Sequence, residues 1–391
     1  MNGNKNPMKS TMTSTTTPEL VSLKEKVERF ARQQIAVRGD LSALDGFPFD
    51  IWKEMGKEGL LGLLLPPHND GIGAAHLPAV AAVETLAAEG GNLGLAFALL
   101  IHLLTSRLIY DFGDAAGVGP LLEQLASGAL TAALGISEPG LGVHPKNLRS
   151  SARREGDFYI LDGEKAYLSN GPIADLFIVV AVTAEEDKRK RFGAFFIPKN
   201  AAGLHIGAAM ELGFLKPSQH CGLSLENCRV PATSLLGDKG TAYEAIAVPF
   251  REHEEVYLQA LVCGGLRKEL DLLVGAIRDQ GVAGDTGLVE KLGEIDALIH
   301  ALRLITYESA AVLDQGAPSA ELNRLSFAFR SMARHTMQAA EQAIHKINLD
   351  TRAALPVMNH DLNHTLSIAG STVRLKQKKL GESLVAGKAA L

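Results

Sequence analysis

The sequence predicts an α+β protein in which two helical regions enclose a region of strands. Apolar residues recur at the three-and-four spacing of a helix in residues 19–131 and again in residues 241–391. Between them, residues 132–240 carry alternating and β-branched runs separated by turn signals at short spacing. A chain of 391 residues is too long for one small core, so we expect several structural units.

The first 18 residues have many Ser and Thr and neither an acid nor an apolar core, and we expect a disordered tail over residues 1–18. The first helix follows in "TPELVSLKEKVERFARQQIA", with Thr17 or Pro18 as its start. Two long apolar helices, "LPAVAAVETLAAEGG" and "LGLAFALLIHLLTSRLIYDFG", each end at glycine. Residues 19–131 are therefore predicted to form an all-helical domain.

Strands are predicted from Ala132 onward. The runs "DFYILDGEKAYLSNG", "ADLFIVVAVT", "RFGAFFIP" and "GLSLENCRVP" alternate or are rich in β-branched residues. Helical periodicity returns after "LLGDKG" and continues through three long amphipathic segments to the C-terminus. A strand domain at 132–240 and a helical bundle at 241–391 follow, with a cleft expected where the domains meet.

Composition excludes several classes of protein. A net charge of −5 without a dominant basic run argues against nucleic acid as a partner. No stretch reaches about 18 consecutive apolar residues, so no membrane span is expected, and "LGLAFALLIHLL" is taken to be too short and interrupted. Three cysteines without CxxC spacing indicate a reducing compartment, and we expect a cytoplasmic protein.

The stretch "ISEPGLGVHP", at 136–145, stands at the junction of the first two domains. Glycine allows backbone to approach a ligand closely and proline fixes the turn around it, which is typical of a binding loop as well as of ordinary turns. "EKAYLSNG", at 164–171, lies in the same strand domain. We expect both polar turns to face one cleft.

These segments resemble the acyl-CoA dehydrogenase family of flavoproteins over nearly all of residues 19–391. "GISEPGLG" is similar to the family's flavin loop, and "DGEKAYLSNGPIADLFIVVA" and "ENCRVPATSLLGDKG" resemble two later family segments. The resemblance implies an N-terminal helical domain, a central β-barrel-like domain and a C-terminal four-helix bundle. It also implies FAD as the cofactor.

Particular residues acquire roles through this resemblance. The backbone at Leu134 and Ile136 and the Ser137 hydroxyl would meet the pyrimidine side of the flavin ring. Tyr167 would stand where the family usually has Trp, and the Ser169 hydroxyl would lie near N5, which gains charge and a proton on reduction. The alternative is that Ser137 and Ser169 only satisfy turn amides. The implied flavin-binding residues are Leu134, Ile136, Ser137, Gly142, Val143, Tyr167 and Ser169.

The chain departs from the family pattern at several places. Val143 and His144 replace the Ser-Asp that usually ends the flavin loop. An Arg and a Phe that reach the flavin of a neighbouring subunit are missing from "RDQGVAGDTGLVEKLG", and "HKINLDTRAAL" replaces a Gly-Gly-x-Gly-Phe turn. At the position of the usual catalytic glutamate stands Ala369, which cannot accept a proton.

Some relatives carry the base on the first helix of the bundle, which corresponds here to "FREHEEVYLQ". Glu254 or Glu255 could then serve, with Glu252 a weaker candidate, because a carboxylate in an apolar cleft has the raised pKa of a base. The alternative is a water-facing acidic cluster at a helix N-terminus. His360 and His364 could share a helix face, but no third ligand is nearby and we expect no metal. His102 and Cys263 are expected to be core residues.

The predicted function is FAD-dependent α,β-dehydrogenation of an acyl group carried as a thioester, on CoA or on an acyl carrier protein. Two alternatives stay open: a flavin monooxygenase on the same fold, and a homologue without flavin that acts as a scaffold or binding subunit. An electron-transfer protein is a further expected partner. By resemblance, the chain forms a homodimer or homotetramer through its C-terminal bundle.

Overall fold

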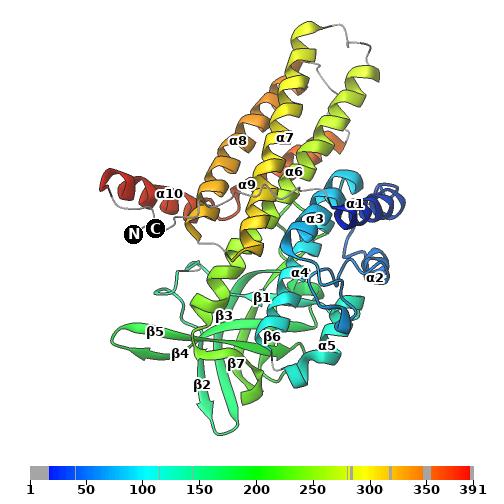
Figure 1. The fold of residues 1–391 in the computed structure, drawn as a ribbon. Coiled ribbons are helices and arrows are strands. Elements are labelled where there is room, and N and C mark those ends of the chain that lie inside the picture. Colours follow the sequence, from blue (N-terminus) through cyan, green and yellow to red (C-terminus); the bar gives the residue numbers. More distant parts are fainter. Residues whose placement is uncertain are drawn as a thin grey trace, which may run out of the picture.

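Three layers of structure follow one another along the chain in the computed structural model (Figure 1). The structure describes residues 17–387 except 40, 114, 143, 280, 282–284, 317–318 and 347–353. N-terminal helices lie on one side, a sheet forms the base, and long C-terminal helices rise above both. The predicted α+β order of helices, sheet and helices is confirmed.

The N-terminal region is helical throughout. Thr17 caps the first helix by accepting a hydrogen bond from the Leu20 amide, and Pro18 is its first residue, where the missing N–H costs nothing. The expected tail of residues 1–18 therefore includes two residues, Thr17 and Pro18, that belong to the start of this helix. Residues 1–16 lie outside the described part. The helices are α1 (Pro18–Phe30), α2 (Phe49–Lys57), α3 (His76–Gly90), α4 (Leu93–Phe112) and α5 (Ala115–Ser127), with short turns η1 (Ala31–Ile35) and η2 (Pro67–Asn69).

Helix α4 is almost wholly apolar from Leu93 to Ser106, and every residue of that stretch is buried. It packs against α3, α5, α6 and the first strand of the sheet. Within the described residues it is the one helix with the length and composition to cross a bilayer. However, 89% of its most apolar stretch is buried in the protein. The sequence analysis took this run to be too short and interrupted to span a membrane, but the helix is 20 residues long. Its polar residues, His102, Thr105 and Ser106, do not interrupt it, because they are hydrogen-bonded inside the core.

The central region forms one mixed sheet of eight strands. Their order is β6-β7-β3-β2-β4-β5-β8, with β1 paired to β4 in parallel. Alternate residues of β4 face opposite cores: Ile178 and Val180 join the helices, and Phe177 and Val179 pack within the sheet domain. The strands are β1 (Ala132–Gly135), β2 (Ser151–Glu155), β3 (Phe158–Ser169), β4 (Leu176–Glu186), β5 (Arg189–Pro198), β6 (Leu204–Ile206), β7 (His220–Pro231) and β8 (Leu235–Gly240), with turns η3 (Gly171–Ile173) and η4 (Ala232–Ser234).

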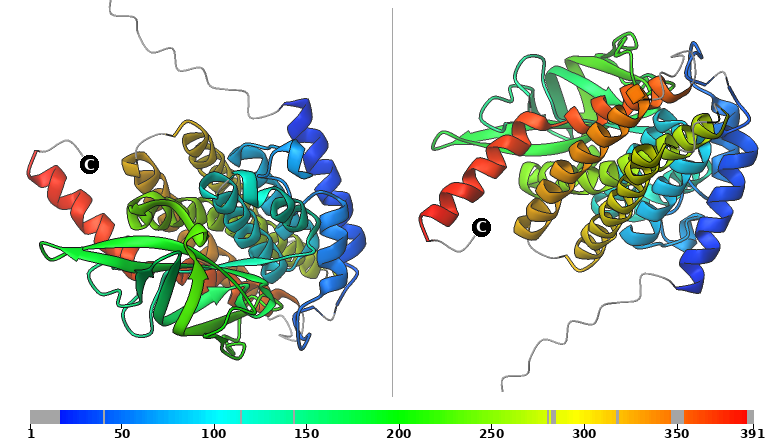
Figure 2. Two further views of the ribbon diagram at one scale, coloured as in Figure 1. Left: turned by 90° about the horizontal axis from the view of Figure 1, so that it is seen from below. Right: turned by 90° about the horizontal axis from the view of Figure 1, so that it is seen from above.

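Helix α6 connects the three regions. It follows a π-helical turn over the sheet and packs against α3, α4, α7, α8 and α9. At Gly264 a side chain would collide with the Glu84 carbonyl, so glycine allows α6 and α3 to approach closely. The last helix extends away from the body (Figure 2). The elements are η5 (Tyr243–Ala247), α6 (Val248–Asp279), α7 (Thr286–Asp314), α8 (Ser319–Lys346), α9 (Ala354–Ser367) and α10 (Gly370–Val385).

Candidate active site

A cavity of about 830 Å³ lies where the sheet, the start of α6 and the α9–α10 junction meet. The first wall comes from the loop after β1 and from the end of β3. The opposite wall comes from α6, α8 and α10. The predicted site residues on its walls are Leu134, Ile136, Ser137, Gly142, Tyr167, Ser169, Glu252, Glu254, Glu255 and Ala369. The predicted flavin contact at Val143 lies outside the described residues.

The loop after β1 closes on itself into a tight turn. The Glu138 amide donates to the Gly142 carbonyl at 3.2 Å, and the Gly142 amide donates back to the Glu138 carbonyl at 3.3 Å. Gly140 and Gly142 both have positive φ, with nothing within 4 Å of an added Cβ, so backbone conformation rather than space requires glycine. The outer side of this turn is therefore open to a ligand.

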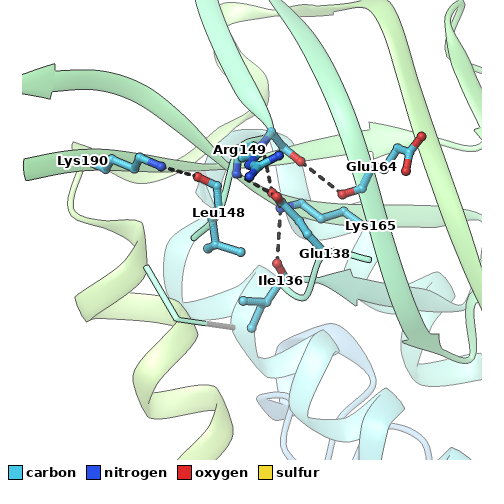
Figure 3. A network of polar contacts seen from close by, with 8 residues as sticks. Ile136, Glu138, Leu148, Arg149, Glu164, Lys165 and Lys190 are labelled. Atoms are coloured by element: carbon cyan, nitrogen blue, oxygen red, sulfur yellow. Dashed lines mark hydrogen bonds and ion pairs between the residues drawn. The ribbon is translucent and has the colours of Figure 1, made fainter. Parts of the chain in front are cut away.

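A buried ion pair anchors this loop to the sheet (Figure 3). The Lys165 ammonium on β3 donates to the Glu138 carboxylate at 2.8 Å and to the Ile136 carbonyl at 3.2 Å. The side chains are 0% and 4% exposed. The same carboxylate accepts the amides of Arg149 at 2.7 Å and Ser150 at 2.9 Å, so both of its oxygens are satisfied.

Burial alone would raise the pKa of Glu138, but Lys165 and the amide and hydroxyl of Ser150 outweigh it and lower the pKa. Sequence reasoning assigned no role to Glu138 or Lys165. A signal was available: Lys165 shares the inward phase of β3 with Tyr159 and Leu161, and a lysine there needs a buried acid.

The end of β3 presents Tyr167 and Ser169 to the cavity. A β-bulge between Lys165 and Leu168 interrupts the pairing with β7, and Tyr167 takes a positive φ of 59° there. Its side chain is 60% exposed and lines the cavity. The hydroxyls of Ser137 and Ser169 make no hydrogen bond with the described residues, so neither satisfies a turn amide there. Both are free to bind a ligand.

Glu254 is the carboxylate on the opposite wall without a partner. It is half-buried and makes neither a hydrogen bond nor an ion pair with any described residue. Burial raises its pKa to about 7, with Arg251 lowering it and Glu255 raising it further. A carboxyl group with this pKa exchanges a proton near neutral pH.

Glu255, the next residue, is fully engaged. Arg330 on α8 donates to its two oxygens at 2.6 and 2.7 Å, and the Ser326 hydroxyl donates at 2.6 Å. Glu252 also lines the cavity and makes no hydrogen bond with the described residues. All three glutamates are half-buried and stand on the cavity wall.

Ala369 lies at the turn between α9 and α10, with a positive φ of 57°. It lines the cavity opposite the loop after β1 but offers no group that can accept a proton. The basic side chains on the wall come from three elements: His144 from the loop, Arg251 from α6 and Lys376 from α10. None of these three forms an ion pair within 4 Å with a described acid.

The remaining singled-out residues serve the core or the surface. His102 is fully buried beside the Leu125 carbonyl at 3.0 Å, and Cys263 is buried with its sulfur 3.4 Å from the Thr306 hydroxyl. His364 stacks on Phe214 at 4.5 Å and contacts His360. The described residues contain no group of three His, Cys, Asp or Glu side chains arranged to hold a metal.

Comparison with known proteins identifies the family. The model of the acyl-CoA dehydrogenase N-terminal domain matches residues 17–129, and that of the middle domain matches residues 133–228. An acyl-CoA dehydrogenase of Bacillus subtilis (strain 168) is 28% identical over 306 residues, which is 77% of this chain and 80% of the relative. The chain belongs to the acyl-CoA dehydrogenase family.

Solved structures share the fold at lower identity. A glutaryl-CoA dehydrogenase from Mycobacterium smegmatis in complex with FADH2 has a TM-score of 0.82 at 20% identity and covers 96% of this chain and 97% of its own. The prolyl acyl carrier protein oxidase AnaB has a TM-score of 0.79 at 23% identity and covers 90% of this chain and 95% of its own.

The cofactor of this family is FAD, as predicted. The residues present fit it on one wall: Leu134, Ile136 and Tyr167 give an apolar face, and Ser137 and Ser169 supply hydroxyls without partners. A flat ring with a polar edge needs both kinds of contact. The predicted gaps in the neighbouring-subunit contacts fall partly on residues 280, 282–284 and 347–353, which lie outside the described part.

Proposed function

We propose that the protein oxidises an acyl thioester by α,β-dehydrogenation, with Glu254 as the base that removes the α-proton. One observation carries the proposal: Glu254 is a half-buried carboxylate on the cavity wall opposite the candidate flavin face, without a hydrogen bond or ion pair to any described residue. A scaffold subunit would not need such a group, because an unpaired carboxylate in a cleft costs stability.

The chemistry divides between the two walls. Bound FAD supplies the acceptor for the two electrons that leave the substrate as hydride. Glu254 would accept the α-proton, the electron pair of the broken Cα–H bond would form the new C=C π bond, and the β-hydrogen would leave as hydride with the Cβ–H pair. The Ser137 and Ser169 hydroxyls orient the ring edge, and the apolar side chains Ile101 and Leu258 exclude water from the far end of the cavity.

Glu254 is preferred to its two neighbours on contacts. Glu255 is held by Arg330 and Ser326, so accepting a proton would break an ion pair with two short bonds. Glu252 shares with Glu254 its place on the cavity wall and makes no hydrogen bond with the described residues. The pKa of Glu254, which burial raises, is a second observation in favour of that residue.

The carrier of the acyl group is CoA or the phosphopantetheine of a carrier protein. His144, Arg251 and Lys376 give the cavity basic groups for its phosphate. Val143 and His144 replace the usual loop residues, which motivates the protein-borne carrier as the narrower hypothesis. Rapid reduction of the flavin by simple acyl-CoAs would contradict that narrower hypothesis but not the reaction.

We also propose a cytoplasmic homo-oligomer that passes electrons to a second protein. The exposed apolar side chains Leu375, Leu384 and Val385 on α10 are suited to contact with a second copy of the chain. Sedimentation of the purified protein tests the oligomer. A monomer at micromolar concentration would contradict this part alone.

The test begins with the visible absorption spectrum of the protein before and after addition of FAD. Anaerobic mixing of the loaded protein with acyl-CoAs, and with acyl groups on phosphopantetheinyl carrier protein, should bleach the flavin band and yield the α,β-unsaturated product. Glu254→Gln should abolish bleaching while retaining FAD. A protein that takes up no FAD would favour the scaffold alternative. Oxygen-dependent hydroxylation of an amine by the reduced protein would instead establish a monooxygenase.

A further inference from the structure

A buried arginine, Arg330, binds Glu255, the residue next to the candidate base. Arg330 sits on the inward stripe of α8 with Ser326, Ala333 and Met337, spaced by four, three and four residues. Its side chain is 3% exposed. A fully buried guanidinium requires partners for its donors, because an unsatisfied buried charge is among the most destabilising defects in a fold.

The partners of Arg330 come from two other elements. Its Nε and Nη2 bind the Glu255 carboxylate of α6 as a two-pronged pair at 2.6 and 2.7 Å. Its Nη1 donates to the Leu366 carbonyl at 2.7 Å and its Nη2 to the Ile368 carbonyl at 3.0 Å. The Leu366 carbonyl belongs to the last turn of α9, where helix geometry leaves it without an internal donor, and Ile368 directly follows that helix. Arg330 therefore joins α6, α8 and the turn that carries Ala369.

This clamp has two consequences for the cavity wall. It holds the Glu255 carboxylate toward α8 with every oxygen engaged, so that side chain cannot turn to the substrate without losing three hydrogen bonds. It also places a positive charge against Glu255, so Glu254 does not stand beside an uncompensated negative charge. The adjacent glutamates differ in environment although they differ by one position in sequence.

We propose that Arg330 is a positioning residue that withdraws Glu255 from the reaction and leaves Glu254 as the carboxylate facing the acyl group. The catalytic meaning of this assignment rests on the proposed function. The effect of Arg330 on the ionisation of Glu254 and Glu255 does not rest on the proposed function, because it concerns these two carboxylates alone. Arg330 is thus held by the carbonyls of Leu366 and Ile368, next to Ala369. Ala369 is the position where the family resemblance would place the base.

The charged and titratable groups around Glu254 are few. Arg251 and Glu255 act on it from its own helix, and Glu252 shares the cavity wall. His144 faces the cavity from the loop, Tyr243 from η5 and Lys376 from α10. Of these groups, Glu255 is the one that loses its partner when Arg330 is substituted, so a changed titration of Glu254 would report the clamp.

A ¹³C NMR titration of protein labelled at the glutamate carboxyl carbons tests the assignment without substrate. The signals of Glu254 and Glu255 are identified by their loss in Glu254→Gln and Glu255→Gln. In Arg330→Met, the pH at which both carboxylates are ionised should rise by about one unit, because an adjacent pair of carboxylates resists double ionisation. In Glu255→Gln, Glu254 should titrate at lower pH than in the wild type.

The double variant Glu255→Gln/Arg330→Met removes both charges and should titrate near the wild-type pH. Shifts of opposite sign in the single variants, cancelling in the double, support the assignment. An unchanged Glu254 titration in all three variants would overturn it and leave Arg330 as a packing element. If Arg330→Met does not fold, Glu255→Gln alone decides, because Arg330 keeps its two carbonyl partners there.

The same variants separate this inference from the proposed function. If Glu254→Gln still bleaches the flavin, the proposed base is wrong, whatever the NMR titration shows. If Glu254→Gln is inactive and the opposed shifts are absent, only the role of Arg330 fails. In the loaded protein, the low-pH limb of the flavin-reduction rate should follow the Glu254 titration in each variant.

Discussion

The two sides of the cavity differ in how they hold a carboxylate: Glu138 is buried behind the loop on the sheet side, and Glu254 stands on the helical wall itself. Glu138 on the sheet side has a lysine and two backbone amides as partners, and its pKa is lowered. Glu254 on the helical side has no hydrogen-bond partner among the described residues, and burial raises its pKa to about 7. The first carboxylate stabilises a loop, and the second is available for proton transfer.

The difference shows that burial alone does not identify a catalytic carboxylate. Glu138, behind the loop, and Glu255, on the helical wall, are the better-bonded acids, and both hold elements together: a loop to a strand, and one helix to another. Catalytic groups are often the ones that the fold leaves unsatisfied, because partners would oppose the change of protonation. The predictions below test this contrast.

The largest expected effect is that of Glu254→Gln on the rate of flavin reduction by an acyl thioester. Removing a positioned general base should lower this rate by a factor of about 10²–10⁴. Rapid mixing under anaerobic conditions measures it, and bound FAD should be retained. Glu308→Gln, at an exposed position on α7, is the matched control, because it removes the same charge as Glu254→Gln. Equal rates in the two variants would place the base elsewhere.

On the other wall, Lys165→Met should damage stability rather than proton transfer. It leaves the Glu138 carboxylate buried without its cation, which costs about 3–5 kcal/mol of unfolding free energy. Urea unfolding at pH 7 measures the loss. Lys190→Met is the matched control, since Lys190 also binds carbonyls of this region, at Lys146 and Leu148, but is only half-buried. We expect the control to lose less than about 1 kcal/mol, and equal losses would contradict the role of the buried pair.

Sequence patterns were sufficient for the fold and for part of the cavity wall. Hydrophobic periods predicted helices, strands and helices, and the motif resemblance predicted Ser137, Tyr167 and Ser169, which the structure brings together. The patterns could not choose between Glu254 and Glu255, because the choice depends on Arg330, which is 75 residues further along the chain. Contacts of that separation leave only an indirect trace, such as an arginine on an inward helix stripe.

The same contrast predicts opposite dependences of stability on pH. For Glu254 the folded pKa of about 7 exceeds the ordinary value of 4.5, so its contribution to stability is lost as pH rises through that window. Glu254→Gln should therefore be more stable than the wild type by about 1–2 kcal/mol at pH 8, with the difference vanishing near pH 4.5. Urea unfolding across this range measures it. For Glu138, whose pKa is lowered, stability is instead lost as pH falls below 4.5.

A pH-independent difference between Glu254→Gln and the wild type would contradict the raised pKa. It would indicate that the carboxylate is solvated in the folded protein, as a water-facing acid would be. The proposed base would then have to be sought among the other cavity groups. The matched control remains Glu308→Gln, whose stability should follow the wild type at every pH.

The smallest expected effect concerns the sheet wall. Ser169→Ala removes a hydroxyl without a partner among the described residues, so it should not destabilise the protein without flavin. If that hydroxyl binds the ring near N5, its loss should slow flavin reduction up to about tenfold, the effect of one hydrogen bond. Rapid mixing and the position of the visible flavin bands measure the change. Since Ser169→Ala leaves Glu254 unaffected, the flavin-reduction rate should fall at the same low pH as in the wild type. A fall at a different pH would mean that the two walls are coupled rather than independent.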